Sequence, residues 1–263
     1  MHFVVLPLSE RGALVRPLSG RSERGAAMLR KILAFGIGLA GAGLAVLPAA
    51  GAAAPTYPNM APAAQYMIAN QADEIALARS AAPASISKDA EVLVLGPKGY
   101  VTAAKGTNGF VCLVERSWDA SFDDPVFWNP NIRGADCLNP AAAKSVLPLF
   151  MERARWALGG VSKADMVAKT KSEITIGAYP MPAPGAMAYM MSKDQYLSDS
   201  AAHHWHPHLM FFIANAKAES WGANMAGSPV VVSQHDSGPF MTFFIPVGKW
   251  SDGTPYEAPM QMN

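Results

Sequence analysis

The apolar segments of the chain fall into two β-type groups with a helical block between them, and this order constrains the fold most. Each group holds three short apolar runs, bounded by glycine, proline and asparagine residues that favour tight turns. The runs are 91–95, 99–104, 109–115, 209–214, 229–234 and 240–247. Strands and helices are grouped and do not alternate regularly. The sequence therefore predicts an α+β fold, with an antiparallel β meander and a C-terminal β-hairpin region packed with about three helices.

The helical block begins at clear start signals. Asn139 followed by Pro140 predicts an N-cap and a first helical position, and Pro148 predicts a kink or a division of this helix. A further helix is expected from Ser162. Another, over residues 62–80, precedes the first β group.

Two other segments lack a regular pattern. Residues 117–140 hold two Asn-Pro steps and four aspartates, Asp119, Asp123, Asp124 and Asp136. Their spacing does not follow an EF-hand loop, so the segment is interpreted as a solvated surface loop. After the helical block, residues 174–178 predict a short strand, which is followed by a loop rich in proline, glycine and methionine.

The N-terminal 52 residues have the pattern of a secretory signal. Arg30 and Lys31 precede an uncharged apolar run over 32–47, and small residues follow at Ala50-Gly51-Ala52. That run is shorter than the ~20 residues of a spanning helix. We expect a signal peptide over 1–52, with the start at Met1 or at Met28, followed by a single exported globular domain over 53–263. The expected location is the periplasm or the extracellular space.

The charge of the chain excludes some classes of partner. The first 52 residues hold six of the 21 Lys and Arg and two of the 20 Asp and Glu, which leaves 15 basic and 18 acidic residues. The remainder then carries a net charge of about −3, with no basic cluster. We therefore expect no nucleic-acid partner and no transmembrane segment after signal removal, and a small-molecule or cell-envelope partner instead.

The chain has two cysteines, Cys112 and Cys137. An oxidising compartment favours a disulfide between them, with two free buried thiols as the alternative. Closing a loop of this length would stabilise the fold by roughly 3.5 kcal/mol in the chain-entropy model.

Histidines are concentrated in one short stretch, AAHHWHPHLMFF, at residues 201–212. If the backbone is extended there, His204, His206 and His208 project to one face, because strand side chains alternate. If the run 209–214 pairs antiparallel with 229–234, His235 and Asp236 arrive at the same place. These side chains form a sufficient ligand set for zinc or copper (Zn or Cu).

The sequence thus predicts an exported protein with a divalent-metal site formed by His204, His206, His208, His235 and Asp236. With an open coordination position, such a site supports metal-assisted hydrolysis. In the alternative, the histidines are structural, with rings stacked on Trp205 and bonded to backbone carbonyls. The protein is then a non-enzymatic binding or cell-envelope interaction domain. Its candidate surface is an aromatic and Met-rich set, namely Trp118, Phe122, Phe127, Trp128, Tyr189 and Met190.

A third reading assigns metal-free acid–base chemistry to His235 and Asp236, with no nucleophile identified. The sequence contains no Gly-x-Ser-x-Gly, Walker A or dinucleotide-binding motif that would assign a reaction.

Overall fold

The structure is a computed structural model that describes residues 57–199, 203–232 and 240–257. The expected signal peptide lies outside these ranges. The strands are β1 (Glu91–Gly96), β2 (Gly99–Ala104), β3 (Val111–Glu115), β4 (Gly134–Leu138), β5 (Met187–Met190), β6 (His208–Ala214), β7 (Val231–Val232) and β8 (Phe240–Pro246). The α-helices are α1 (Gln71–Arg79), α2 (Ala84–Ser87), α3 (Pro140–Ser145), α4 (Leu147–Leu158) and α5 (Lys163–Thr175). Short 3-10 helices are η1 (Ala63–Tyr66), η2 (Ser117–Asp119) and η3 (Ala218–Trp221). In these ranges no helix is both long and apolar enough to cross a membrane.

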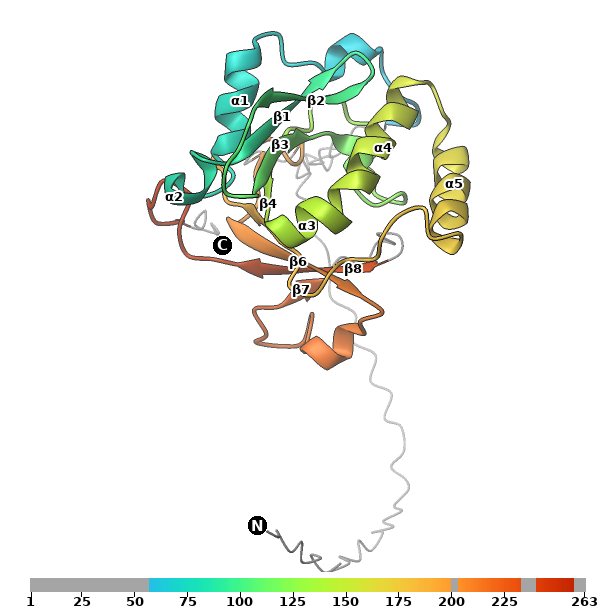
Figure 1. Cartoon of the computed structure of the whole chain (residues 1–263). Helices are drawn as coiled ribbons and strands as arrows, with labels where there is room; N and C mark the ends of the chain where they lie inside the picture. The colour runs from blue at the N-terminus through green and yellow to red at the C-terminus, as the bar shows by residue number, and fades with distance from the viewer. Residues whose placement is uncertain (1–56, 200–202, 233–239, 258–263) are drawn as a thin grey trace, which may run out of the picture. The chain divides into compact units, whose positions relative to one another are not determined.

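The eight strands form a single sheet in the order β2-β1-β3-β4-β5-β6-β8-β7 (Figure 1). Every neighbouring pair is antiparallel except β1 and β3, which run parallel. The mixed α and β content confirms the predicted class at this level. The predicted meander is wrong, because β3 lies beside β1 and leaves β2 at the sheet edge.

The connection between β2 and β3 explains this arrangement. It passes back over the start of β1, where the Thr107 amide donates to the Asp89 carbonyl at 2.8 Å and the Glu91 amide donates to the Phe110 carbonyl at 2.9 Å. A Cβ atom on Gly106 would lie 2.0 Å from the Glu91 nitrogen, so only glycine fits at this crossing. The turn residues were thus correctly identified, but the crossing of the β2–β3 connection over β1 depends on contacts between segments that are distant in the sequence.

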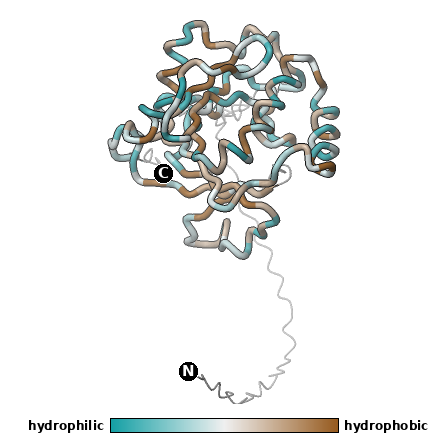
Figure 2. The backbone as a smooth tube through the Cα atoms, in the orientation of Figure 1, coloured by the Kyte–Doolittle hydropathy of each residue, from teal (hydrophilic) through white to brown (hydrophobic). Residues whose placement is uncertain are grey.

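Helices cover both faces of the strands β1, β3 and β4. Figure 1 shows α1 and α4 on opposite sides of them. On the α1 side, Cys112, Val114 and Cys137 pack with alanines of α1 and the segment that follows it. On the other side, Leu113 and Leu138 pack in the larger core with α3 and α4. Because both faces are buried, these strands are apolar along most of their length, as the brown central segments of Figure 2 show.

The predicted helix start signals are confirmed. The Asn139 side chain accepts a hydrogen bond from the Ala142 amide at 2.9 Å, and Pro140 opens α3. Pro148 lies in the first turn of α4 and marks the division between the two helices. Ser162 caps α5 through the Asp165 amide. The expected strand at 174–178 is wrong, because α5 continues to Thr175.

The interpretation of residues 117–140 as a solvated loop is also wrong. Its last part forms β4, which is buried along its whole length. Four of the residues proposed as an interaction surface are buried in the core: Trp118, Phe127, Trp128 and Met190. Strand β4 was hard to recognise because it is buried on both faces and so shows no alternation, and because its first residues, Gly134 and Ala135, carry little β preference.

The predicted disulfide between Cys112 and Cys137 is confirmed. The two residues are direct cross-strand partners in the β3–β4 pair, and both are fully buried. The disulfide therefore fixes the register of β3 on β4, and with it the positions of the polar side chains that flank the two cysteines.

The C-terminal pairing differs from the predicted one. Strand β6 pairs with β8, from His208 opposite Pro246 to Ala214 opposite Phe240, and β7 lies on the outer side of β8. The predicted pairing of 209–214 with 229–234 is therefore not formed by the described residues of the second segment, 229–232.

Candidate functional site

The described histidines of the predicted metal site occupy different environments. His204 lies edge-on to Trp250 at a centroid distance of 5.1 Å, and His206 contacts Tyr256 at 4.6 Å. Only His208 belongs to a strand, and it packs against Trp205 at 4.8 Å. Alternation along a strand therefore does not bring the three rings to one face.

His208 is the buried member of this group. Its Nδ1 donates to the His206 carbonyl at 2.6 Å, which places the ring proton on Nδ1 because a carbonyl only accepts. Burial lowers the pKa of His208 to about 4, so its ring is neutral near pH 7. The bond to a carbonyl is a contact that the structural alternative expected, but the Trp205 and His208 rings are tilted by 59° and are not stacked.

The part of the chain that the structure describes contains no group of three or more His, Cys, Asp or Glu side chains that could hold a metal ion. His235 and Asp236 lie outside the described residues. Val232 lies beside Phe243 on β8, and Phe240 lies beside Ala214, at the opposite end of β6 from His208. Among the described residues, the pairing on which the metal prediction rested is therefore absent, and the metal site itself stays a prediction.

Metal analysis of the purified, untagged domain checks that prediction. If His206 and His208 are ligands, the wild-type protein holds zinc or copper at about one ion per chain, and His206→Ala and His208→Ala each lose it. Metal well below one ion per chain in the wild type, after supplementation with both ions, would contradict the site.

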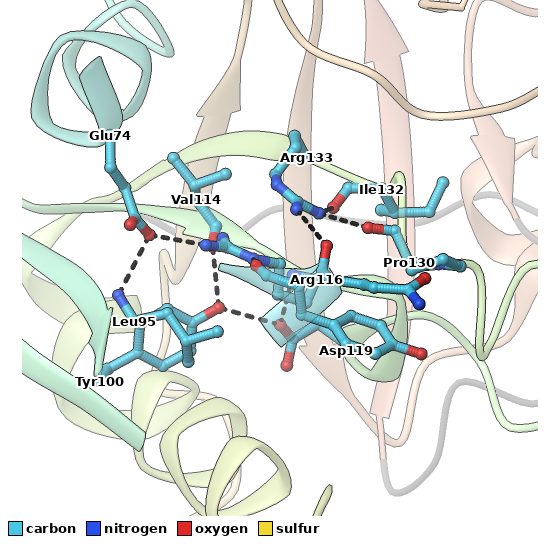
Figure 3. Close-up of polar contacts among 11 residues, drawn as sticks. Glu74, Leu95, Tyr100, Val114, Arg116, Asp119, Pro130, Ile132 and Arg133 are labelled. Atoms are coloured by element: carbon cyan, nitrogen blue, oxygen red, sulfur yellow. Dashed lines mark hydrogen bonds and ion pairs between the residues drawn. The ribbon is translucent and has the colours of Figure 1, made fainter. Parts of the chain in front are cut away.

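A buried polar cluster lies where α1 meets the strands β1 and β3 (Figure 3). Glu74, from α1, forms an ion pair with Arg116 at 2.8 Å, and both side chains are almost completely buried. The Arg116 guanidinium also donates to the carbonyls of Tyr66 and Val114. An arginine is rarely buried unless it is paired in this way.

This cluster replaces a missing part of the β ladder. Strands β1 and β3 pair only at their first two residues, so later backbone groups need other partners. Glu74 accepts from the Leu95 amide at 3.1 Å, while Arg116 and the Tyr100 hydroxyl donate to the Val114 carbonyl. The role of the Glu74–Arg116 pair is therefore structural.

A cavity of about 230 Å³ lies beside this cluster, between α4 and the strands β4, β6 and β8. Most of its wall is apolar, and one end carries acidic and basic side chains. The apolar lining includes Ile132, Leu149, Phe150, Met190, Leu197, Met210, Phe212, Phe240 and Phe244. The polar lining includes Glu115, Arg116, Asp119, Ser121, Asp124, Arg153 and Thr242. None of the described histidines lines it.

The register of β6 on β8 determines which side chains form the apolar wall of the cavity. Met210 pairs with Phe244 and Phe212 with Thr242, so these four side chains share one face of β6 and β8. Phe150, from α4, meets Phe212 edge-on at a centroid distance of 6.3 Å. Rigid elements therefore hold the apolar wall.

Three carboxyl groups have raised pKa values: Glu115 and Asp119, which line the polar end, and Asp136, which interacts with Glu115 but does not line the cavity. Burial, followed by the negative charges of Asp136 and Asp119, raises the pKa of Glu115 well above its ordinary range. Burial raises the pKa of Asp119 to about 7, although the Arg116 amide and the charge of Arg153 act in the opposite direction. Burial also raises the pKa of Asp136 to about 7. Such shifts are common at functional sites.

Arg153 is the basic side chain that faces this end from α4. Its guanidinium donates to the carbonyls of Trp118, Asp119 and Ala120, with the shortest distance, 3.0 Å, to Ala120. It also lies over the Phe122 ring, 4.1 Å from the centroid. Arg153 therefore fixes the segment that carries Asp119 to helix α4.

Sequence reasoning missed this site because its aspartates, Asp119, Asp124 and Asp136, were assigned to a solvated loop, while Glu115 ended a predicted strand. The available signal was the cysteine pair. If Cys112 and Cys137 are opposite each other on antiparallel strands, Asp136 must lie opposite Leu113. Leu113 and Glu115 are two residues apart on β3, so Asp136 and Glu115 lie next to each other on the same face of the sheet.

Comparison of the chain with protein-family models, curated proteins and solved structures finds no match.

Proposed function

We propose that this domain binds a small molecule that is mostly apolar, with one polar end, in the cavity between α4 and the strands β4, β6 and β8. The observation that carries the proposal is the cavity itself, which combines a wall of phenylalanine and methionine with a few polar groups at one end. Concave, largely apolar sites with a few placed polar groups are typical of small-molecule binding sites.

The size of the cavity limits the ligand. A water molecule takes roughly 30 Å³ in the liquid, so a volume of about 230 Å³ suits a molecule of the order of ten non-hydrogen atoms. The aromatic side chains Phe150, Phe212, Phe240 and Phe244 surround the apolar part. A phenyl-sized body is therefore a suitable probe.

The same features favour binding over catalysis by a histidine-activated nucleophile. No imidazole of the described residues reaches the cavity, and His208, the one histidine on the inner face of β6, packs against Phe244 beyond the cavity lining. This proposal corresponds to the non-enzymatic alternative, but it moves the site from surface aromatics to the interior.

Titration of the labelled protein with 2-phenylethanol, phenethylamine and phenylacetate, followed by amide chemical shifts, tests the proposal. We expect saturable shifts for at least one probe at amides of α4, β6 and β8. Met210→Trp fills the cavity and is expected to abolish them, whereas Met225→Trp, at a side chain that is 61% exposed, leaves them unchanged.

Gly134→Ala provides a milder cavity variant. A Cβ atom there would meet only side-chain atoms, with Leu197 Cδ2 at 3.3 Å and Met190 Cε at 3.4 Å, so the fold can accommodate it. We expect weaker binding in this variant. The absence of saturable shifts for all three probes, or unchanged binding in a folded Met210→Trp protein, contradicts the proposed function.

A further inference from the structure

We infer that the ligand of this cavity is an organic cation, with a protonated amine at the carboxylate end and an apolar body against the phenylalanines of β6 and β8. The inference rests on the proposed function, because it names the chemical class of the molecule that the cavity would take. It follows from the balance of charged groups around the polar end.

Acidic groups are in excess at this end. Glu115, Asp119 and Asp124 line the cavity. Asp136 lies on the same face of the sheet as Glu115, since Leu113 pairs with Asp136 and Glu115 with Gly134. These carboxyls come from β3, the segment after it and β4, so three neighbouring parts of the chain direct acidic groups to one place.

Basic groups do not balance them. The Arg116 guanidinium is paired with Glu74 at 2.8 Å and directs its remaining donors to backbone carbonyls. Arg153 is the other guanidinium at this end; it donates to three carbonyls and lies over the Phe122 ring, and its positive charge also acts on Glu115 and Asp119. Once the Glu74–Arg116 pair is set aside, a single guanidinium faces several carboxyls.

Asp136 shows the imbalance most clearly. It is 0% exposed, and neither of its carboxylate oxygens meets a hydrogen-bond donor in normal geometry. The polar groups that act on it are the Glu115 carboxyl and the Cys137 amide, and burial outweighs both, so the pKa of Asp136 is raised to about 7. A buried carboxylate without donors is unfavourable unless it is protonated or a positive charge lies nearby.

An ammonium group meets this requirement. It supplies three donors, and the half-buried Glu115 and Asp119 can be reached from the cavity. Its charge favours the ionised form of the surrounding carboxyls, which hold protons near pH 7 because their pKa values are raised. Binding of a cation therefore releases protons.

The rest of the cavity suits the apolar body of such a ligand. Phe212 and Phe240 meet edge-on at a centroid distance of 5.8 Å, and Phe244 continues the same face of the sheet. An anionic ligand would add a further negative charge beside Glu115, Asp119 and Asp136. Like charges at short range are disfavoured in a poorly solvated site.

The decisive comparison uses phenethylamine and 2-phenylethanol, which have the same number of non-hydrogen atoms and differ in charge. At about pH 8, we expect the amine to bind at least tenfold more tightly than the alcohol, and phenylacetate to bind more weakly than either. Calorimetry in two buffers of different ionisation enthalpy is expected to show proton release on amine binding to the wild-type protein.

Glu115→Gln is expected to reduce the preference for the amine to about twofold or less while the alcohol still binds. Asp73→Asn, the same loss of charge at an exposed site on α1, leaves the preference unchanged. Equal binding of amine and alcohol to the wild type overturns this inference but leaves the proposed function intact. Tighter binding of phenylacetate also overturns it, whereas no binding of any probe overturns the proposed function itself.

Discussion

Replacing Arg116 with methionine is expected to lower the free energy of unfolding by about 3–5 kcal/mol. The substitution leaves the Glu74 carboxylate buried without its counter-charge, since the two side chains are 0% and 3% exposed. It also removes donors from the carbonyls of Tyr66 and Val114, at the place where β1 and β3 no longer pair. Urea denaturation followed by tryptophan fluorescence measures the change.

An exposed ion pair provides the control. Arg155 contacts Glu152 one turn earlier on α4, and its side chain is 53% exposed. Arg155→Met is therefore expected to change stability by less than about 1 kcal/mol. The double variant Glu74→Gln/Arg116→Met should recover part of the loss, because no unpaired charge stays buried. Similar losses for Arg116→Met and Arg155→Met would contradict the role assigned to the buried pair.

Capping residues and prolines in the sequence correctly predicted where the helices of the central block begin. Asn139 and Pro140 start α3, Pro148 divides it from α4, and Ser162 caps α5, because capping and the missing proline N–H act within one turn. The disulfide was also predictable, since it needed only two cysteines and an oxidising compartment.

Pairing between distant segments was not predictable from the same signals. The glycine-bounded turns around β2 were correctly placed, yet β3 runs parallel to β1 because residues 105–110 cross over the start of β1. Likewise, β8 lies between β6 and β7, although the apolar runs that form them follow the expected order along the chain. Periodicity tells which face of a strand is buried, but it does not choose the neighbouring strand.

Errors in element assignment and in strand pairing both affected the prediction of the functional residues. His204 and His206 precede β6, so the alternation assumed for them does not apply. Glu115 and Asp136 were not recognised as neighbours, because β4 was read as part of a loop. Acidic residues in an irregular, polar segment are usually solvated, and only the β3–β4 register shows that Asp136 is buried.

The acidic cluster leads to a prediction for the pH dependence of stability. Burial raises the pKa of Asp136 from 3.8 in the unfolded chain to about 7 in the folded protein. The folded state therefore keeps a proton that the unfolded state loses above about pH 4. This contribution is fully present below that pH and is lost as the pH rises through about 7. We expect the stability advantage of Asp136→Asn over the wild type to be small at about pH 5 and to grow by roughly 2–4 kcal/mol by about pH 8.

The titration of His208 affects the pH dependence of stability in the opposite direction, and its effect must be separated from that of Asp136. Its pKa falls from 6.5 to about 4 on folding, so the unfolded state binds a proton that the folded state does not. Its contribution to stability therefore increases with pH between about 4 and 6.5, and it partly masks the carboxyl effect in the wild-type curve. Because Asp136→Asn retains His208, the difference between the two curves isolates the carboxyl group.

Urea denaturation of wild type, Asp136→Asn and Asp73→Asn from about pH 5 to about pH 8 measures this difference. Asp73 is exposed on α1, so its variant is expected to run parallel to the wild type. Parallel curves for Asp136→Asn as well would mean that Asp136 is ionised and stabilised throughout, and that its carboxylate already has donors in the folded protein. A gap that widens with pH would instead show that the folded domain holds an acidic group without a positive partner, which is the condition on which binding of a cation depends.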